Sequence, residues 1–476
     1  MDSKNAEQRG KRIARISRSS LRFQYSENQP PVGRYIDGYV RYWFLVPLSL
    51  WLGMWLNLNT GFWNITNPTT LNEWQLLIRA GIPYVSLPLG LVLLCISQDK
   101  LPVMKASPNG FLLFYGCIAA FATVFSPQPE FSYYWSLNFL AAILCTWLMV
   151  KQEASWLSAR QLLEATWVIC FVAAVMLSYQ GRNSLFGGSP GSEGAYGINV
   201  ELQDLSRSSG VGRWAAIPAL VFLLRAFVSN GAKAKIAYFG AALFCSYVVY
   251  RVQSRGAVFG VLGAILLAFL ASRKFQGRFA VLLISVLLAA SIYGSVAPDS
   301  NPENLGKSFN RYVHRGQSEE EFRSMTGRTR AYRHGLAAFW DSPLLGMGQW
   351  TDRLHPEIGE HIHNSFLQSL LNGGIVGFVS YICSWIAGWF LFFQLWMKRY
   401  LLAQIDQRLL LEAGMVMAFF TLRAIPETTT ASFSVDLMVM VAVYCYMEAL
   451  GCTVLKPATA RKVSLGSKPK QVRGVI

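Results

Sequence analysis

Long apolar runs separated by short polar segments account for most of the chain. Each run approaches the roughly 20 residues that a helix needs to cross a bilayer. We place twelve of them, at residues 42–58, 79–97, 110–126, 134–150, 162–179, 211–228, 234–250, 256–272, 279–296, 374–397, 409–424 and 434–452. The pattern predicts an all-α polytopic membrane protein with about 12 transmembrane helices.

Charged residues make up only 14% of the 476 residues, well below the roughly 25% of soluble domains. They gather between the apolar runs, and the loops expected on the same side as the N-terminal arm are all basic. These loops hold Lys100 and Lys105, Lys151 and Arg160, Lys233 and Lys235, Arg273, Lys274 and Arg278, and Lys398, Arg399 and Arg408. Because cytoplasmic loops carry an excess of Lys and Arg, we predict that both termini are cytoplasmic.

The apolar runs divide the chain into five regions. They are a basic cytoplasmic arm (1–41), nine transmembrane helices (42–296), a large external loop (297–363), three further transmembrane helices (364–452) and a basic cytoplasmic tail (453–476). No cleavage site follows the first apolar run, so we expect no cleavable signal peptide. The basic arm is either a solvated tail or a contact with membrane lipid, and its place beside a membrane span makes a nucleic-acid partner unnecessary.

The large external loop contains one segment with helical periodicity. Arg328, Tyr332, Leu336 and Phe339 recur at helical spacing, and Pro343 ends the pattern. We predict an amphipathic helix on the outer surface, with its wetter side formed by Arg330, Arg333 and His334.

A histidine lies at the C-terminal end of the large external loop, where the chain is expected to re-enter the membrane. His363 precedes a short apolar-periodic helix at 365–371; Gly373 and Gly374 then weaken the helix before the span that follows. An imidazole at a water–lipid boundary suits proton transfer near neutral pH. The alternative is that His363 only caps the helix.

Several arginines lie at the outer membrane boundary, against the positive-inside bias. They are Arg207, Arg213, Arg251, Arg255 and Arg423. Isolated arginines near helix ends commonly reach for lipid headgroups. Several on one side, together with His363, favour an anion site, because Arg suits bidentate phosphate recognition.

Other chemistry has little support in the sequence. The eight cysteines lie in or beside apolar runs without metal-ligand or disulfide spacing, so we interpret them as buried small residues. A cluster of His355, Glu357, Glu360, His361 and His363 is a possible metal site, but its spacing matches no motif. No nucleotide-binding loop is present, so we expect no cofactor and a phosphate-bearing donor that arrives within the bilayer.

Three blocks of sequence resemble a known family. His363-Asn364, nine residues, then Gly374-Ile-Val-Gly377 is similar to the signature of bacterial O-antigen ligases and related polysaccharide polymerases. Thr326-Gly-Arg-Thr329 and Ser342-Pro-Leu-Leu-Gly-Met-Gly348 resemble blocks that precede this signature, particularly in exopolysaccharide polymerases, and Ser254-Arg255-Gly256 gives weaker support.

The resemblance implies a metal-independent, inverting transfer of a glycan from undecaprenyl pyrophosphate to an acceptor hydroxyl, at the periplasmic face of the inner membrane. The acceptor is another glycan or the lipid A core, so ligase and polymerase both stay open. His363 corresponds to the family's histidine, and Arg255 with Arg207 or Arg213 to its pyrophosphate-binding arginines. We expect substrate contacts from Arg251, Arg328, Arg330, His361, Asn364 and Arg423. A multi-span transporter or lipid-linked oligosaccharide flippase is the competing interpretation.

Overall fold

A computed structural model of the chain describes residues 38–58, 62–63, 71–96, 107–150, 155–182, 208–252, 254–272, 276–277, 328–356, 358 and 361–455. The chain forms two compact units, Met1–Leu48 and Ser49–Ile476. All regular structure in the described part is helical. The helices are α2 (Gly38–Asn57), α3 (Glu73–Ile96), α4 (Pro108–Phe121), η2 (Ala122–Phe125), α5 (Pro129–Leu148), α6 (Ser155–Gln180), α9 (Ser208–Val228), α10 (Ala232–Val252), α11 (Arg255–Ala271), α15 (Arg328–Phe339), α16 (Thr351–Leu354), α17 (Ser365–Met397), η3 (Arg399–Leu401), α18 (Gln404–Arg423) and α19 (Val435–Val454).

The all-helical membrane class predicted from the apolar runs is confirmed. Seven helices in the described part are long and apolar enough to cross a membrane, and the helix at 255–271 is apolar but shorter. Every predicted span within the described residues overlaps a helix. The span at 279–296, the arm at 1–37, the loop at 297–327 and the tail from 456 onward lie outside those residues. The count of twelve spans therefore stays a prediction.

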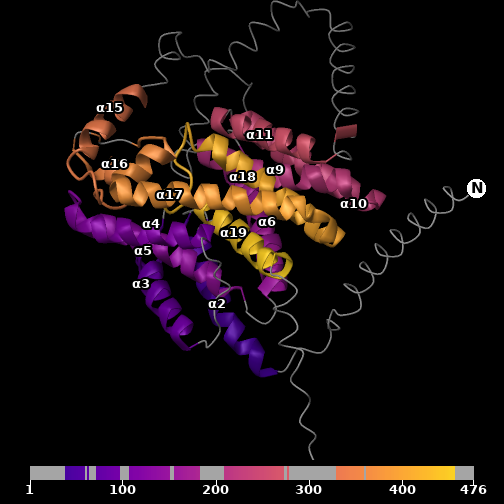
Figure 1. The fold of residues 1–476 in the computed structure, drawn as a ribbon, viewed down its shortest axis with the longest axis horizontal. Helices are drawn as coiled ribbons and strands as arrows, with labels where there is room; N and C mark the ends of the chain where they lie inside the picture. Colours follow the sequence, from indigo (N-terminus) through magenta and orange to yellow (C-terminus); the bar gives the residue numbers. More distant parts are fainter. Residues whose placement is uncertain are drawn as a thin grey trace, which may run out of the picture. The chain divides into compact units, whose positions relative to one another are not determined.

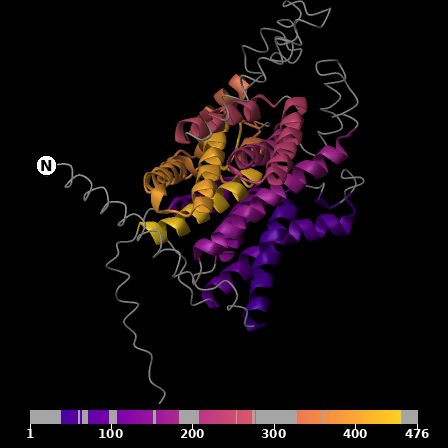
Figure 2. The ribbon, with the colours of Figure 1, turned by 90° about the vertical axis from the view of Figure 1, so that its right-hand side faces the viewer.

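Helix α19 forms the centre of the larger unit. It packs against α4, α5, α6, α17 and α18, and nearly all of its residues are buried. Figure 2 shows the orange and yellow C-terminal helices against the purple and magenta helices that precede them. Because α19 is apolar around its whole circumference, a position enclosed by other helices is the one that its sequence favours.

Four charged side chains are paired between α6, α9 and α18. Arg225 makes two hydrogen bonds to Glu412 at 2.8 and 2.9 Å and lies 2.7 Å from Glu164. Arg408 lies 3.0 Å from Glu164 and 3.2 Å from Glu412. The two positive and two negative charges balance, which is what buried charge requires.

The predicted weak point after the short helix is confirmed. Helix α17 is broken at Gly374, where φ is +60° and ψ is −162°. A Cβ at this position would lie 2.3 Å from the Leu344 carbonyl carbon, so only glycine fits. The helix runs beside α4, and α15 and α16 lie at its N-terminal end (Figure 1).

The segment 342–348 fills the break in α17. The N–H groups of Met347 and Gly348 donate to the carbonyls of Leu371 and Asn372, at 2.9 and 3.0 Å. In the other direction, the N–H groups of Ile375 and Val376 donate to the carbonyls of residues 343 and 344. Backbone groups freed by a break in a membrane helix need such partners. The two blocks at 342–348 and 374–377 thus form one structural unit.

The predicted surface helix is present as α15, although one detail of its packing was wrong. Its buried side is formed by Ala331, Gly335, Ala338 and Phe339, whereas Leu336 is 52% exposed. The reason is close packing, because a Cβ on Gly335 would lie 2.7 Å from Ile362. The interpretation of all cysteines as buried was also wrong for Cys95 and Cys117, whose side chains are exposed.

Candidate functional site

The site is built around the short segment that leads into α17. His361 and His363 are two residues apart, and their ring centroids lie 4.5 Å apart. Ile362, between them, is fully buried with Phe339, Met347 and Leu371. His363 has φ of +53°, a left-handed conformation that is uncommon outside glycine. Packing on both sides therefore holds this histidine in a backbone conformation that it would rarely adopt alone.

Residues 364 and 365 fasten this segment to the loop between α18 and α19. Asn364, not His363, is the N-cap of α17: its side chain accepts from the N–H of Leu367 at 2.8 Å and donates to the Ile425 carbonyl at 3.0 Å. The Ser365 hydroxyl accepts from the N–H of Thr429 at 2.7 Å. The alternative that His363 serves as the cap is therefore excluded.

His363 is paired with a buried carboxylate. Its Nδ1 lies 3.0 Å from Glu427, whose side chain is only 10% exposed. Arg328 at the start of α15 reaches the other carboxylate oxygen at 3.3 Å and donates to the Pro426 carbonyl at 2.8 Å. Burial alone would raise the pKa of Glu427, but the hydrogen bond from His363 and the charges of Arg423 and Arg328 lower it to about 2. Glu427 is therefore ionised, and as a hydrogen-bond acceptor it favours a proton on Nδ1 of His363.

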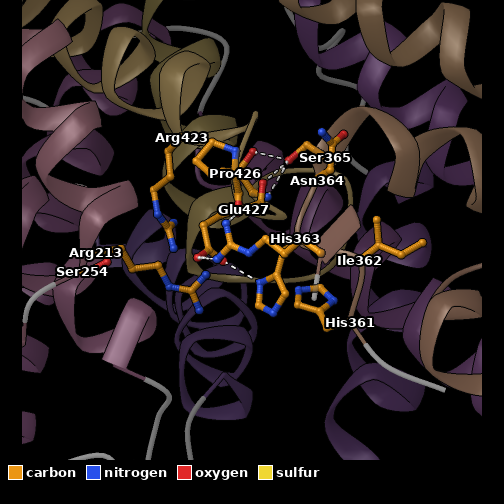
Figure 3. A network of polar contacts seen from close by, with 12 residues as sticks. Arg213, Ser254, His361, Ile362, His363, Asn364, Ser365, Arg423, Pro426 and Glu427 are labelled. Atoms are coloured by element: carbon orange, nitrogen blue, oxygen red, sulfur yellow. Dashed lines mark hydrogen bonds and ion pairs between the residues drawn. The ribbon is translucent and has the colours of Figure 1, made fainter. Parts of the chain in front are cut away.

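Two arginines from distant parts of the sequence meet beside this pair. Arg213 near the start of α9 and Arg423 at the end of α18 both bind Asp436, at 3.4 and 2.6 Å. Figure 3 shows both guanidinium groups on the side of Glu427 and His363 that is opposite to His361. The Nε of Arg213 is a buried donor for which the described residues supply no acceptor.

The N-terminus of α11 borders the same site. Ser254 caps the helix by accepting from the N–H of Ala257 at 3.4 Å. A Cβ on Gly256 would lie 3.3 Å from Glu427, and one on Gly212 would lie 2.7 Å from Ser254. Arg255, the first residue of α11, is thus within one residue of this close contact. A helix N-terminus attracts anions through its partial positive charge.

The structure brings together some of the predicted site residues and not others. Arg213, Arg328, Arg423, His361, His363 and Asn364 lie in one connected cluster, and Arg255 begins the helix that borders it. Arg330 is exposed on the outward side of α15, and Arg251 is buried in the last turn of α10. Arg207 lies outside the described residues, as do Thr326 and Gly327.

Three acidic residues of the cluster were missed by sequence analysis: Asp352, Glu427 and Asp436. Each is at most 8% exposed. A signal was present for two of them, because Glu427 and Asp436 flank a polar stretch at 427–434 between apolar runs, next to Arg423. Acidic residues at such a boundary need partners, and the neighbouring arginine was the obvious one. No comparable signal marks Asp352, which lies in a loop rich in charge.

A second imidazole–carboxylate pair lies on the other side of His363. The Nδ1 of His361 is 2.7 Å from Asp352, which also accepts from the Ile362 N–H at 3.2 Å and from Gln368 Nε2 at 3.1 Å. Gln368 in turn donates to Asn372 at 2.9 Å. Asp352 is 2% exposed, so buried hydrogen bonds hold this pair in place.

The metal alternative finds no support in the described part of the chain. No three His, Cys, Asp or Glu side chains there converge as metal ligands would. Glu357 and Glu360 lie outside the described residues. The two imidazoles instead bind separate carboxylates, which leaves one nitrogen on each ring for a substrate.

Taken together, the cluster combines an imidazole with several guanidinium groups. Arg213, Arg328 and Arg423 balance the charges of Asp352, Glu427 and Asp436, and Arg255 begins the helix beside them. Such a site can take up a proton at His363 and stabilise an anionic group beside it.

Comparison with known protein families gives one match. A family model described as O-antigen ligase matches residues 240–382. The match includes Arg251, Arg255, Arg328 and the segment 361–364, whereas Arg213, Arg423 and Glu427 lie outside it. Among curated proteins, nothing matches the chain.

Proposed function

We propose that this multi-pass membrane protein, of which residues 240–382 match a family model described as O-antigen ligase, transfers a glycan from undecaprenyl pyrophosphate to an acceptor hydroxyl. The reaction takes place at the periplasmic face of the bacterial inner membrane, in the biosynthesis of a cell-surface polysaccharide. The observation that carries the proposal is the convergence of His363, Glu427, Arg213 and Arg423, which come from widely separated parts of the sequence.

His363 is the general base in this proposal. Glu427 accepts a hydrogen bond from Nδ1–H, so the lone pair of Nε2 is available to the acceptor hydroxyl. The acceptor oxygen forms a bond to the anomeric carbon while its proton passes to Nε2. The imidazolium that results is stabilised by the Glu427 carboxylate. A positioned general base contributes about 10²- to 10⁴-fold to a rate.

The arginines stabilise the leaving group. As the new glycosidic bond forms, the bond from the anomeric carbon to the pyrophosphate oxygen breaks, and its electron pair stays on that oxygen. Arg213, Arg423 and Arg255 neutralise the departing charge, and Arg207, Arg251 and Arg330 are further candidates for phosphate contacts. Direct displacement of this kind inverts the anomeric centre. The energy comes from the donor, so neither ATP nor a metal ion takes part.

Arg328 and Asn364 act mainly by position. Arg328 ties α15 to Glu427 and Pro426, and Asn364 caps α17 and binds the Ile425 carbonyl. Both contacts hold the loop at 424–429 against the segment that carries His363. We therefore expect their loss to disturb the distance between base and carboxylate before it weakens substrate binding.

Transport is the second candidate, and one observation favours it. The cluster of Arg225, Arg408, Glu164 and Glu412, of which Arg225 and Glu412 are buried, places charges between helices, as transporters do. The cluster is neutral overall and fully paired, which also fits a purely structural role. A flippase that moves lipid-linked oligosaccharide would need these ion pairs to separate during transport.

An assay in detergent separates the two. Purified protein is mixed with lipid-linked glycan donor and acceptor, without a sealed membrane. A transferase forms the glycoside and releases undecaprenyl pyrophosphate, because transfer needs no compartment, whereas a transporter yields no product. Arg255→Ala is expected to abolish the product, and Arg399→Ala, an exposed arginine that contacts Trp396, to leave it unchanged.

The Thr326-Gly-Arg-Thr329 block favours polymerase over ligase. Mass analysis of the glycan that accumulates in cells lacking the protein distinguishes them. Single lipid-linked repeat units indicate a missing polymerase, and long lipid-linked chains indicate a missing ligase.

A further inference from the structure

The pair of His361 and Asp352 has no role in the mechanism above, although it lies against the proposed base. Asp352 is ionised: burial alone would raise its pKa, but the hydrogen bond with His361, the charge of Arg353 and the N–H of Ile362 lower it. Burial lowers the pKa of His361, against the effect of Asp352, and the adjacent His363 and Arg353 lower it further. A neutral His361 that donates Nδ1–H to Asp352 therefore keeps a lone pair on Nε2.

The two imidazoles make the same kind of contact. Each donates its Nδ1 proton to a carboxylate, at 2.7 Å for His361 and 3.0 Å for His363. Within the described part of the chain, no hydrogen bond engages Nε2 of either ring. The two side chains remain 18% and 23% exposed.

We propose that this arrangement binds two neighbouring hydroxyls of one acceptor sugar, an inference that rests on the proposed glycan transfer. His363 takes the proton of the reacting hydroxyl, and His361 accepts a hydrogen bond from the hydroxyl on the adjacent ring carbon. Ring centroids 4.5 Å apart allow both hydrogen bonds at ordinary lengths of about 2.8 Å. The acceptor is then a vicinal diol of a sugar ring, not a lone hydroxyl of a serine, a threonine or a lipid alcohol.

Asp352 is the positioning residue of this pair. It sets which nitrogen of His361 carries the proton, as a carboxylate does for a catalytic imidazole. Gln368 and the Ile362 N–H hold the carboxylate, and Asn372 extends the network from Gln368. Without the carboxylate, the His361 ring could rotate or carry its proton on Nε2. It would then no longer accept a hydrogen bond from the hydroxyl of the acceptor sugar.

The first test needs no variant. Purified wild-type protein is incubated in detergent with lipid-linked glycan extracted from cells that lack it, and methylation analysis identifies the linkage in the product. The proposal predicts a free hydroxyl on the ring carbon next to the new bond. A neighbouring carbon that is deoxygenated, N-acetylated or otherwise substituted, or an acceptor that is not a sugar, overturns it.

The second test separates His361 from His363 by kinetics. Asp352→Asn and His361→Gln should raise KM for the acceptor about tenfold or more, because a polar partner is lost, while KM for the donor stays within twofold. The matched control is Asp341, whose side chain is 63% exposed and lies 3.4 Å from the buried His355; Asp341→Asn should change neither KM. The inference is overturned if the KM for the acceptor is unchanged in both variants. It is also overturned if the KM values for donor and acceptor rise equally.

The two proposals fail in different ways. If the wild-type protein forms no glycoside, glycan transfer itself is wrong. If transfer occurs and depends on His363 but the product linkage lacks a neighbouring hydroxyl, only the inference about the acceptor is wrong. High acceptor concentration should restore the rate of Asp352→Asn but not that of His363→Ala.

Discussion

Replacement of Glu427 by glutamine isolates what the carboxylate does for His363. Glutamine keeps the size of the side chain and an oxygen that can accept a hydrogen bond from Nδ1–H, but it removes the negative charge. The pKa of Glu427 falls from its ordinary 4.5 to about 2. At about 1.4 kcal/mol for each tenfold change, this corresponds to about 3 kcal/mol in favour of the carboxylate. His363, Arg423 and Arg328 supply that preference against the effect of burial.

Much of this interaction should stabilise the imidazolium that forms when His363 carries the acceptor's proton. A loss of about 3 kcal/mol in the transition state lowers kcat about 10²-fold, and we expect KM for the donor to change less than threefold. The assay is glycoside formation in detergent with saturating donor. Glu130→Gln, an exposed acidic residue at the start of α5, is the matched control and should keep full activity. A kcat within threefold of the wild type for Glu427→Gln would refute the pairing as a catalytic feature.

The same carboxylate gives a pH dependence of stability. A group with a lowered folded pKa stabilises the protein above its unfolded pKa, and this stabilisation disappears as pH falls through the folded value. The difference in thermal stability between wild type and Glu427→Gln should therefore be constant from pH 7 to about pH 5 and shrink toward pH 2. A difference that disappears already near pH 6 would show that another group is responsible.

Three further predictions concern the scaffold and the chemistry. Gly374→Ala should prevent accumulation of folded protein, because the new Cβ meets the Leu344 carbonyl at 2.3 Å, whereas Gly240→Ala, with open space around it, should not; normal yields of both would contradict the role of the break in α17. Glu412→Gln should destabilise the protein by about 3–5 kcal/mol in denaturant unfolding, since Arg225 loses its bidentate partner, and an unchanged midpoint would show that the cluster contributes nothing. Chelation of divalent metal should leave the transfer rate unchanged in the detergent assay, and a loss restored by added metal would reverse the assignment.

Local sequence was sufficient to predict the helices, because a membrane-spanning helix consists of a long, contiguous run of apolar residues. The break at Gly374 was equally local, since adjacent glycines weaken a helix whatever surrounds them. The packing side of α15 was not local. Gly335 lies on that side because Ile362 approaches closely, while the larger Leu336 remains exposed. Periodicity identifies an amphipathic helix, but the shape of its partner decides which residues are covered.

Some of the residues that converge were predictable, but their pairings were not. Arginines on the outer side indicated an anion site, and His363 indicated a base. Their carboxylate partners depend on how the loop after α18 folds back on the segment before α17, and that contact joins residues more than sixty positions apart. The pair of Asp352 and His361 likewise depends on the left-handed turn at Trp350, where φ is +66°, which no pattern of apolar residues specifies.

The central claim is that His363 performs the chemistry beside Glu427, Arg213 and Arg423. Its most direct test is the single-turnover rate of glycan transfer by purified His363→Ala, measured in detergent with donor and acceptor both saturating and with folding checked by thermal unfolding. We predict a folded protein that binds donor but transfers at least 10²-fold more slowly, while His334→Ala on α15 matches the wild type. Transfer by folded His363→Ala at the wild-type rate would contradict the account.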